Sequence, residues 1–162
     1  MSGQTKRKVL YFAYGSNMDP ERMEKRIGEF YSIEGAILRG YRLAFNKKAQ
    51  GKPGEGYANI VRDDSRAVEG VLYEIDEEKL KKLDKFEGVP YHYRRCEITV
   101  ECKDDRGKMR TCKAIAYIAN ENMVDKGDRL KPTREYLGHL LKGKGFLSKE
   151  YVEMLEKVET LD

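Results

Sequence analysis

The chain has 162 residues, of which 40% are hydrophobic, with 32 basic and 28 acidic side chains and a formal net charge of +4. This length suits a single domain over residues 1–162, with a flexible basic N-terminus at 1–7, and no apolar stretch is long enough to span a membrane. Basic and acidic residues are interleaved, and the nearest basic patches, at 47–52 and 142–144, are interrupted, so we expect a solvated surface and no nucleic-acid partner.

The first predicted elements are a strand, a turn and a helix. Residues 9–14 are apolar and rich in aromatic side chains, which predicts a buried strand. The turn Tyr14-Gly15-Ser16-Asn17 follows, and Asp19 before Pro20 has the chemistry of an N-cap and a first helical residue, which predicts a helix over 20–26. A strand, a glycine turn and a helix N-terminus in succession aim free backbone N–H groups at an anion.

The middle of the chain is predicted to be mostly strands, over 30–46 with breaks at Gly35 and Gly40, and over 57–62 and 67–75. The segment 50–56 between them holds three glycines and a proline and is the clearest predicted loop. A helix over 76–86 is then expected to end at Gly88-Val89-Pro90.

Two alternating strands over 93–103 and 109–119, joined by a turn at 104–107, predict a β-hairpin. Two helices, near 133–141 and 148–158, complete the chain. Strands in the middle with helices toward both ends predict an α+β domain whose sheet curls into a barrel.

The cysteines and the N-terminus indicate location. Cys96, Cys102 and Cys112 have no CxxC spacing, which is typical of reduced thiols in a cytoplasmic protein. In the predicted hairpin, Cys102 would face a position near Met109 rather than Cys112, so no close pair is expected. The apolar run behind the basic N-terminus is too short for a signal peptide.

Glu87 lies at an unusual position, at the C-terminal end of the helix predicted over 76–86. Three apolar residues define a stripe centred on Leu83, and at helical spacing Glu87 lies about 40° from that centre. Burial and the helix C-terminus both raise the pKa of a carboxyl group there. Two interpretations follow: a structural ion pair with Arg94 or Arg95, or a general acid/base that titrates near neutrality.

Four segments together carry a family resemblance, namely Tyr14-Gly15-Ser16-Asn17, Gly40-Tyr41-Arg42-Leu43-Ala44-Phe45, Glu69-Gly70-Val71-Leu72-Tyr73, and Leu83-Asp84-Lys85-Phe86-Glu87-Gly88 followed by Tyr91, Tyr93 and Arg94. From about Val9 to the C-terminal helices the chain resembles the gamma-glutamylcyclotransferase-like family. The resemblance implies a small distorted mixed or antiparallel β-barrel with flanking helices. It also implies that Glu87 is the catalytic acid/base and that the turn from Tyr14 to Asn17 holds an anionic group.

The implied reaction converts a γ-glutamyl amide of an amino acid, peptide or amine to 5-oxoproline and a free amine. The substrate's α-amine attacks its own side-chain carbonyl, so the reaction needs no protein nucleophile, metal or cofactor. Glu87 would take the ammonium proton and later protonate the leaving amine. The N–H groups of Gly15, Ser16 and Asn17 would hold substrate oxygens, either the α-carboxylate or the developing oxyanion.

Several tyrosines are further candidates. Tyr14 is expected to form a wall of the pocket or to end the core of its strand. Tyr93 is expected to donate its hydroxyl to the substrate, with Tyr91 as the competing choice because alternation places both on one face. Tyr117 fits core packing at least as well as ligand contact, and Tyr136, at the start of a late helix, is a candidate to close the pocket.

Other functional classes are weighed beside this enzyme. The alternatives are a non-catalytic protein that binds a small anion or a γ-glutamyl compound, and a basic module that binds acidic partners through its lysines. His92 and His139 lie far apart without ligand spacing, so we expect no metal and no cofactor. The expected partner is a small γ-glutamyl substrate, without nucleic acid or membrane. The resemblance allows a homodimer, although no self-complementary apolar surface can be read from the sequence.

Overall fold

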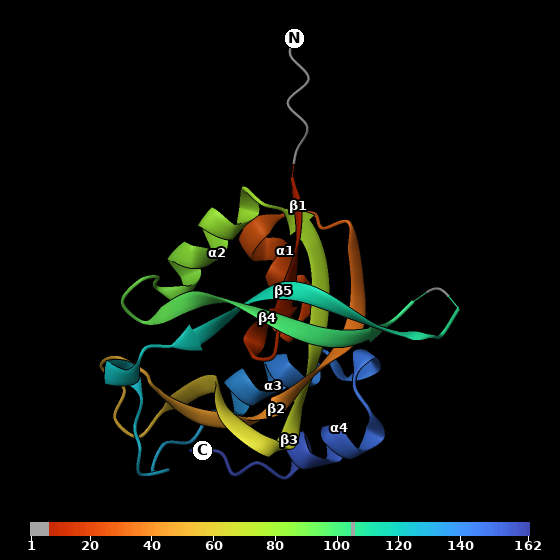
Figure 1. The fold of residues 1–162 in the computed structure, drawn as a ribbon. Helices are drawn as coiled ribbons and strands as arrows, with labels where there is room; N and C mark the ends of the chain where they lie inside the picture. The colour runs from red at the N-terminus through yellow and green to blue at the C-terminus, as the bar shows by residue number, and fades with distance from the viewer. Residues whose placement is uncertain (1–6, 105) are drawn as a thin grey trace.

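Five strands close into a barrel in the order β1-β3-β2-β4-β5 in the computed structural model, which describes residues 7–104 and 106–162 (Figure 1). The strands are β1 (Lys8–Ala13), β2 (Ser32–Lys48), β3 (Gly56–Asp76), β4 (Tyr93–Lys103) and β5 (Met109–Ala119). Neighbouring strands are antiparallel except β1 and β5, which meet in parallel at Tyr11 and Ile115. This mixed barrel with its flanking helices confirms the predicted fold class.

Four α-helices and three 3₁₀ turns of the described residues surround the barrel: η1 (Ser16–Met18), α1 (Pro20–Ile27), α2 (Lys79–Glu87), η2 (Glu121–Met123), α3 (Arg134–Leu141), η3 (Lys144–Phe146) and α4 (Lys149–Glu156). In Figure 1, α1 and α2 lie above the middle of the barrel, and α3 and α4 lie below it. The turn η1 contacts α1, α3, β1 and β3, so it lies where these elements converge. Among the helices in the described part of the chain, none has the length and apolar character needed to cross a bilayer.

The two longest strands differ from the prediction. Both β2, with 17 residues, and β3, with 21, run without the interruptions expected at Gly35 and Gly40 and between residues 62 and 67. Gly40 has a φ of 86° and lies at a register shift between Arg39 and Tyr41. A glycine at such a bulge bends a strand instead of ending it, which lets β2 and β3 curve around the barrel.

The predicted helix over 76–86 also changes its bounds. Asp76 pairs with Lys8 as the last residue of β3, so α2 begins at Lys79. The helix ends as expected, because Gly88 adopts the left-handed conformation, with φ 66° and ψ 36°. Glu87 is therefore the last residue of the helix.

The β4–β5 hairpin has the predicted strand bounds, and Cys102 faces a position next to Met109 as expected, but the two cysteines of the hairpin nevertheless lie close together. Cys102 pairs with Arg110, and Cys112 pairs with Val100. This diagonal arrangement puts both thiols on one face of the hairpin, with their Sγ atoms 3.2 Å apart. Residue 105 of the predicted turn, and residues 1–6 of the predicted flexible N-terminus, lie outside the described residues.

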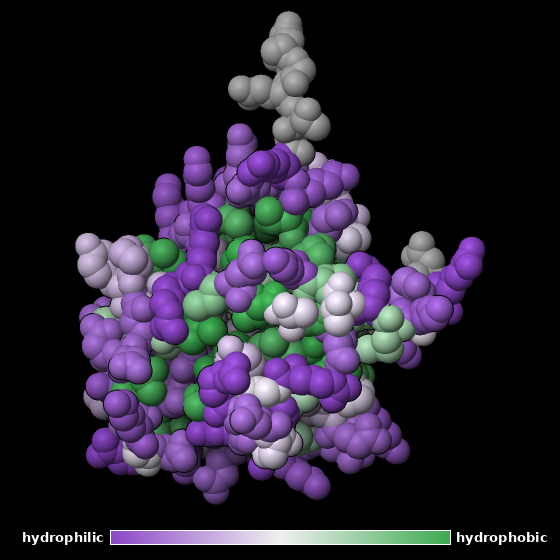
Figure 2. Space-filling view, in the orientation of Figure 1, coloured by the Kyte–Doolittle hydropathy of each residue, from purple (hydrophilic) through white to green (hydrophobic). Residues whose placement is uncertain are grey.

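The C-terminal half of strand β1 is buried on both faces, which explains its uninterrupted apolar sequence. Tyr11 and Ala13 face the core beneath the helices, whereas Phe12 and Tyr14 face the core inside the barrel. Figure 2 shows mostly hydrophilic residues over the outer surface of this face, with apolar residues between them over the middle of the barrel. The end of β1 thus delivers the Tyr14 turn to the junction of two cores.

Gly70 of β3 tests the close packing of this junction. A Cβ atom there would lie 2.4 Å from the carbonyl oxygen of Ala13 and 2.8 Å from the ring of Phe12. We expect Gly70→Ala to lower the free energy of unfolding by about 1–3 kcal/mol, measured by urea denaturation. The matched control is Gly138→Ala on α3, where a Cβ meets nothing within 4 Å and stability should stay equal or rise by up to about 1 kcal/mol. An unchanged urea midpoint for Gly70→Ala would contradict the packing described.

Candidate active site

A cavity of about 30 Å³ lies at the end of β1. The structure brings all seven residues singled out in the sequence to its wall: Tyr14, Gly15, Ser16, Asn17, Glu87, Tyr93 and Tyr136. Sequence reasoning missed Tyr11 and Ala58 and left Tyr117 open, and all three also line the cavity. No sequence pattern distinguishes Tyr11, because a cavity residue and a core residue have the same apolar pattern on a strand that is buried on both faces.

The turn after β1 lines the cavity and has backbone N–H groups without a partner inside the turn. The Met18 N–H donates to the Gly15 carbonyl at 3.0 Å, and the Asp19 N–H donates to the Ser16 carbonyl at 3.2 Å. The N–H groups of Ser16 and Asn17 open this 3₁₀ turn and therefore have no carbonyl within it to bond. The Asp19 carboxylate caps α1, as predicted, by accepting hydrogen bonds from the backbone N–H groups of Glu21 and Arg22.

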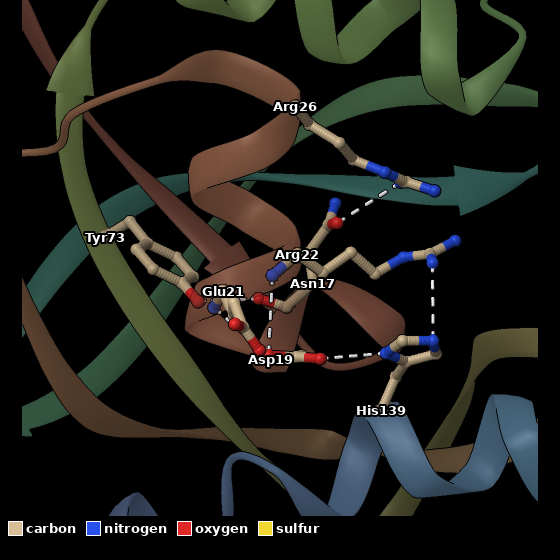
Figure 3. Close-up of polar contacts among 7 residues, drawn as sticks. All are labelled: Asn17, Asp19, Glu21, Arg22, Arg26, Tyr73 and His139. Atoms are coloured by element: carbon tan, nitrogen blue, oxygen red, sulfur yellow. Dashed lines mark hydrogen bonds and ion pairs between the residues drawn. The ribbon is translucent and has the colours of Figure 1, made fainter.

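Asn17 connects the turn to Glu87. Its Nδ2 donates to Glu87 Oε1 at 3.3 Å and to Tyr11 Oη at 3.0 Å. Its Oδ1 accepts from Arg26 Nη1 at 3.2 Å, and its backbone carbonyl accepts from Tyr73 Oη at 2.7 Å (Figure 3). With a side chain so fully bonded and only 2% exposed, Asn17 fixes the carboxyl group of Glu87 relative to the turn.

The pKa of Glu87 is raised from 4.5 to about 7. Burial is the largest cause, because it disfavours the charged carboxylate, while the positive charges of Arg26, Arg22 and Lys47 act in the opposite direction and lower the pKa. The side chain is still partly exposed at the cavity mouth. A carboxyl group with this pKa can accept and release a proton near neutral pH.

The predicted alternative, an ion pair of Glu87 with Arg94 or Arg95, is not formed. Arg95 instead makes a bidentate pair with Asp84, at 2.8 and 2.6 Å, and Arg94 Nη1 donates to the carbonyl of Ala119 at 3.2 Å. Within residues 7–104 and 106–162, Glu87 has no ion pair within 4.0 Å.

The cavity tyrosines use their hydroxyl groups differently. Tyr93 Oη donates to the carbonyl of Ala58 at 2.8 Å. Its proton is therefore not free for a substrate, in contrast to the expectation from the sequence. Tyr136 Oη instead accepts from the Ala58 N–H at 3.0 Å, which leaves its own proton available to the cavity. Tyr14 donates to the carbonyl of Tyr117 and thus serves as a wall.

Two other tyrosines are also placed by the structure. Tyr91, the alternative to Tyr93, lies before β4 and is 75% exposed, away from the cavity. Tyr117 contributes its ring to the cavity wall, but its hydroxyl donates to Asp84 Oδ1 at 2.8 Å. Burial raises the pKa values of Tyr14, Tyr93 and Tyr136, so these hydroxyls stay protonated.

A larger basin of about 630 Å³ adjoins the cavity and shares four of its lining residues: Ser16, Glu87, Tyr93 and Tyr136. Gln50 and Lys52 of the predicted loop also line this basin. Lys47 lines it too and is only 3% exposed, which corrects the expectation of a solvated patch at this position. Among the described residues, no group of three or more His, Cys, Asp or Glu side chains is arranged to hold a metal ion.

Comparisons with known proteins agree with the motifs. The sequence model of the family described as "Gamma-glutamyl cyclotransferase, AIG2-like" matches residues 11–138. The chain is 33% identical to a gamma-glutamylcyclotransferase from Bos taurus, in an alignment that covers 94% of this chain and 80% of that protein. It is 29% identical to the gamma-glutamylcyclotransferase from Homo sapiens, over 100% of this chain and 85% of that protein. A solved structure titled "Gamma-glutamyl cyclotransferase" superposes with a TM-score of 0.77 at 29% identity, over 96% of this chain and 90% of that chain.

The raised pKa of Glu87 predicts a pH-dependent effect of Glu87→Gln on stability. Between pH 4.5 and about 7, the unfolded carboxyl ionises while the folded one keeps its proton, so the wild type loses stability as the pH rises. Glutamine does not titrate and retains an oxygen for Asn17. We expect the stability of Glu87→Gln relative to wild type to increase by up to about 3 kcal/mol from pH 4 to pH 8, measured by urea denaturation. A difference that stays constant over this range would show that the pKa of Glu87 is not raised.

Proposed function

The chain belongs to the gamma-glutamyl cyclotransferase, AIG2-like family and is a cyclotransferase, and we propose that it converts a γ-glutamyl amide to 5-oxoproline and a free amine with Glu87 as acid/base. The observation that supports this most is a carboxyl group with a pKa of about 7 in the same cavity as the backbone donors of the Gly15 turn. A protein that only bound an anion would need those donors, but it would gain nothing from a buried carboxyl group among them.

The reaction joins two groups of one substrate. The nitrogen of the substrate's α-amine attacks the side-chain carbonyl carbon and forms a five-membered lactam. The bond from that carbon to the amide nitrogen breaks, and the leaving amine takes a proton; no water is consumed. The protein therefore has to fold the substrate back on itself, move one proton and stabilise the oxyanion of the tetrahedral intermediate.

Glu87 is suited to move that proton. In its ionised form it accepts a proton from the α-ammonium, and in its protonated form it donates a proton to the departing amine. A pKa of about 7 makes both forms accessible near neutrality. Asn17 acts as a positioning residue, because its Nδ2 holds Oε1 of Glu87 and leaves the second carboxyl oxygen for the substrate.

Other hydrogen-bond donors of the cavity wall hold the substrate's oxygens. The N–H groups of Ser16 and Asn17 open the 3₁₀ turn, and the Tyr136 hydroxyl has a proton to donate. Tyr14 and Tyr93, whose hydroxyls bond to backbone carbonyls, shape the wall that binds the substrate. Preorganised donors of this kind stabilise an oxyanion without reorganisation during the reaction.

We further propose a single domain in a reducing, cytoplasmic compartment. The strands form one barrel, with one hydrophobic core inside it and an adjoining core beneath the helices. Cys96, Cys102 and Cys112 are free thiols. The family resemblance allows a homodimer, and gel filtration with light scattering would test this oligomeric state.

The central test is release of 5-oxoproline from a panel of γ-glutamyl amino acids and amines. We expect wild type to release it and Glu87→Gln to lower kcat by about 100-fold or more, because the acid/base is lost. The matched control is Glu78→Gln at the exposed start of the same helix, which should keep wild-type turnover. Wild-type turnover by a folded Glu87→Gln protein would exclude Glu87 as the acid/base. Absence of product from any substrate would instead favour a binding protein.

Gly15 tests the turn as the substrate-binding element. A Cβ atom there would lie 3.2 Å from Ala58 Cβ and 3.3 Å from Tyr136 Oη, so the branched side chain of Gly15→Val has to displace the turn or the tyrosine. We expect KM to rise about 10-fold or more, since the donors to the substrate move. Gly145→Val is the matched control, because a Cβ there meets nothing within 4 Å. An unchanged KM for Gly15→Val would argue against this turn.

A further inference from the structure

The basin outside the cavity carries an excess of positive charge. Its lining includes five cationic side chains and one acidic side chain, Glu87. The cations come from α1, β2, α2 and the loop between β2 and β3: Arg22, Arg26, Lys47, Lys52 and Lys85. Figure 3 shows the guanidinium groups of Arg22 and Arg26 extending from α1 toward the same side. Separate elements thus converge on one cationic basin.

Lys47 is the buried cation of this basin. It is only 3% exposed, and its Nζ donates to the carbonyl of Lys48 at 2.7 Å and lies 2.8 Å from His92 Nδ1. The rings of Tyr57 and Tyr93 lie 5.7 Å from the ammonium. In the described part of the chain, no carboxylate lies within 4.0 Å of it. Burying an ammonium group without an acidic partner is costly, so a structural ion pair does not account for its place.

The two arginines are also contacted by groups other than carboxylates. Arg22 Nη1 lies 3.4 Å from Nε2 of His139, and Arg22 Nε is buried without a hydrogen-bond partner. Arg26 Nη1 donates to Oδ1 of Asn17 at 3.2 Å. Neither forms an ion pair with a carboxylate within the described residues. Their charges remain available to an anion in the basin.

The γ-glutamyl group does not supply enough negative charge for this basin. It carries one carboxylate, and its reacting end has to lie in the inner cavity beside Glu87. The rest of the substrate, which becomes the leaving amine, extends toward the basin of about 630 Å³. An effect on the pKa of Glu87 does not explain all five cations either. Arg26, Arg22 and Lys47 lower that pKa, but Lys52 and Lys85 are not among the groups that shift it.

On the basis of the proposed function, we propose that this basin is a leaving-group subsite that selects γ-glutamyl compounds whose leaving amine carries two or more carboxylates. Lys47 forms the buried centre of the subsite, and Arg22, Arg26, Lys52 and Lys85 surround it. The exposed ring of Phe86, over which Arg26 stacks at 4.8 Å, offers an apolar surface to the methylene groups of such a leaving group.

Two isosteric substrates test the selection. γ-Glutamyl-glutamate and γ-glutamyl-glutamine differ only by a carboxylate in place of a carboxamide in the leaving amine. We expect kcat/KM for 5-oxoproline release to be about 10-fold higher for γ-glutamyl-glutamate at low ionic strength. The ratio should fall severalfold in about 0.5 M NaCl, because salt screens the interaction. Equal kcat/KM values for the two compounds, or a ratio insensitive to salt, would overturn the subsite while leaving the cyclisation itself established.

Replacing single lysines by the uncharged methionine shows which residues cause the preference for γ-glutamyl-glutamate. Lys47→Met should lower kcat/KM for γ-glutamyl-glutamate more than for γ-glutamyl-glutamine and bring the ratio toward one. Lys85→Met, at an exposed position of α2 where folding is not at risk, should lower the ratio in the same direction. Lys82→Met is the matched control, exposed on the same helix but outside the basin, and should keep the wild-type ratio. A wild-type ratio in both basin variants would overturn the assignment.

Equilibrium binding separates this inference from the proposed function. If no γ-glutamyl compound of the panel yields 5-oxoproline, the proposed function fails, and the affinities of γ-glutamyl-glutamate and γ-glutamyl-glutamine for Glu87→Gln decide about the basin. Binding of γ-glutamyl-glutamate about 10-fold tighter than γ-glutamyl-glutamine, measured by titration calorimetry, supports the anionic subsite. Equal affinities overturn it.

Discussion

The site depends on the side chain of Asn17, which joins two parts of the chain that are far apart in sequence. Its amide nitrogen holds Glu87 at the end of α2, and its amide oxygen accepts from Arg26 on α1. Its backbone carbonyl accepts from Tyr73 of β3, so the turn itself is tied to the barrel. One buried residue therefore sets the distance between the backbone donors of the turn and the carboxyl group that faces them.

The charge state of Glu87 results from two opposed effects of the same surroundings. The tyrosine-lined cavity removes water from the carboxylate and raises its pKa, whereas Arg22, Arg26 and Lys47 stabilise the charged form. Burial alone would keep the carboxyl group protonated, and the neighbouring cations alone would keep it ionised. A pKa of about 7 reflects both effects, and the carboxyl group of Glu87 lies at the boundary between the tyrosine-lined cavity and the cationic basin.

That boundary also divides the site by task. The cavity wall combines the turn at Gly15 with several tyrosines, and the hydroxyls of Tyr14 and Tyr93 are bonded to backbone carbonyls. The basin is larger, and its cations come from four separate elements. Lys52 and Lys85 are not among the groups that shift the pKa of Glu87, so substitutions at these two positions can alter the basin without changing the charge state of Glu87.

The sequence by itself determined the local features: the buried strand before the Gly15 turn, the Asp19 cap, the glycine end of α2, the hairpin, and Glu87 on the core-facing side of its helix. Each depends on a few adjacent residues, through periodicity, capping or backbone conformation. Only the tertiary structure decided that β2 and β3 run through their glycines, that Cys102 lies beside Cys112, and that Lys47 is buried next to the site. These depend on barrel closure, which brings residues from 11 to 136 to one cavity wall, and such contacts leave no periodic trace in any single segment.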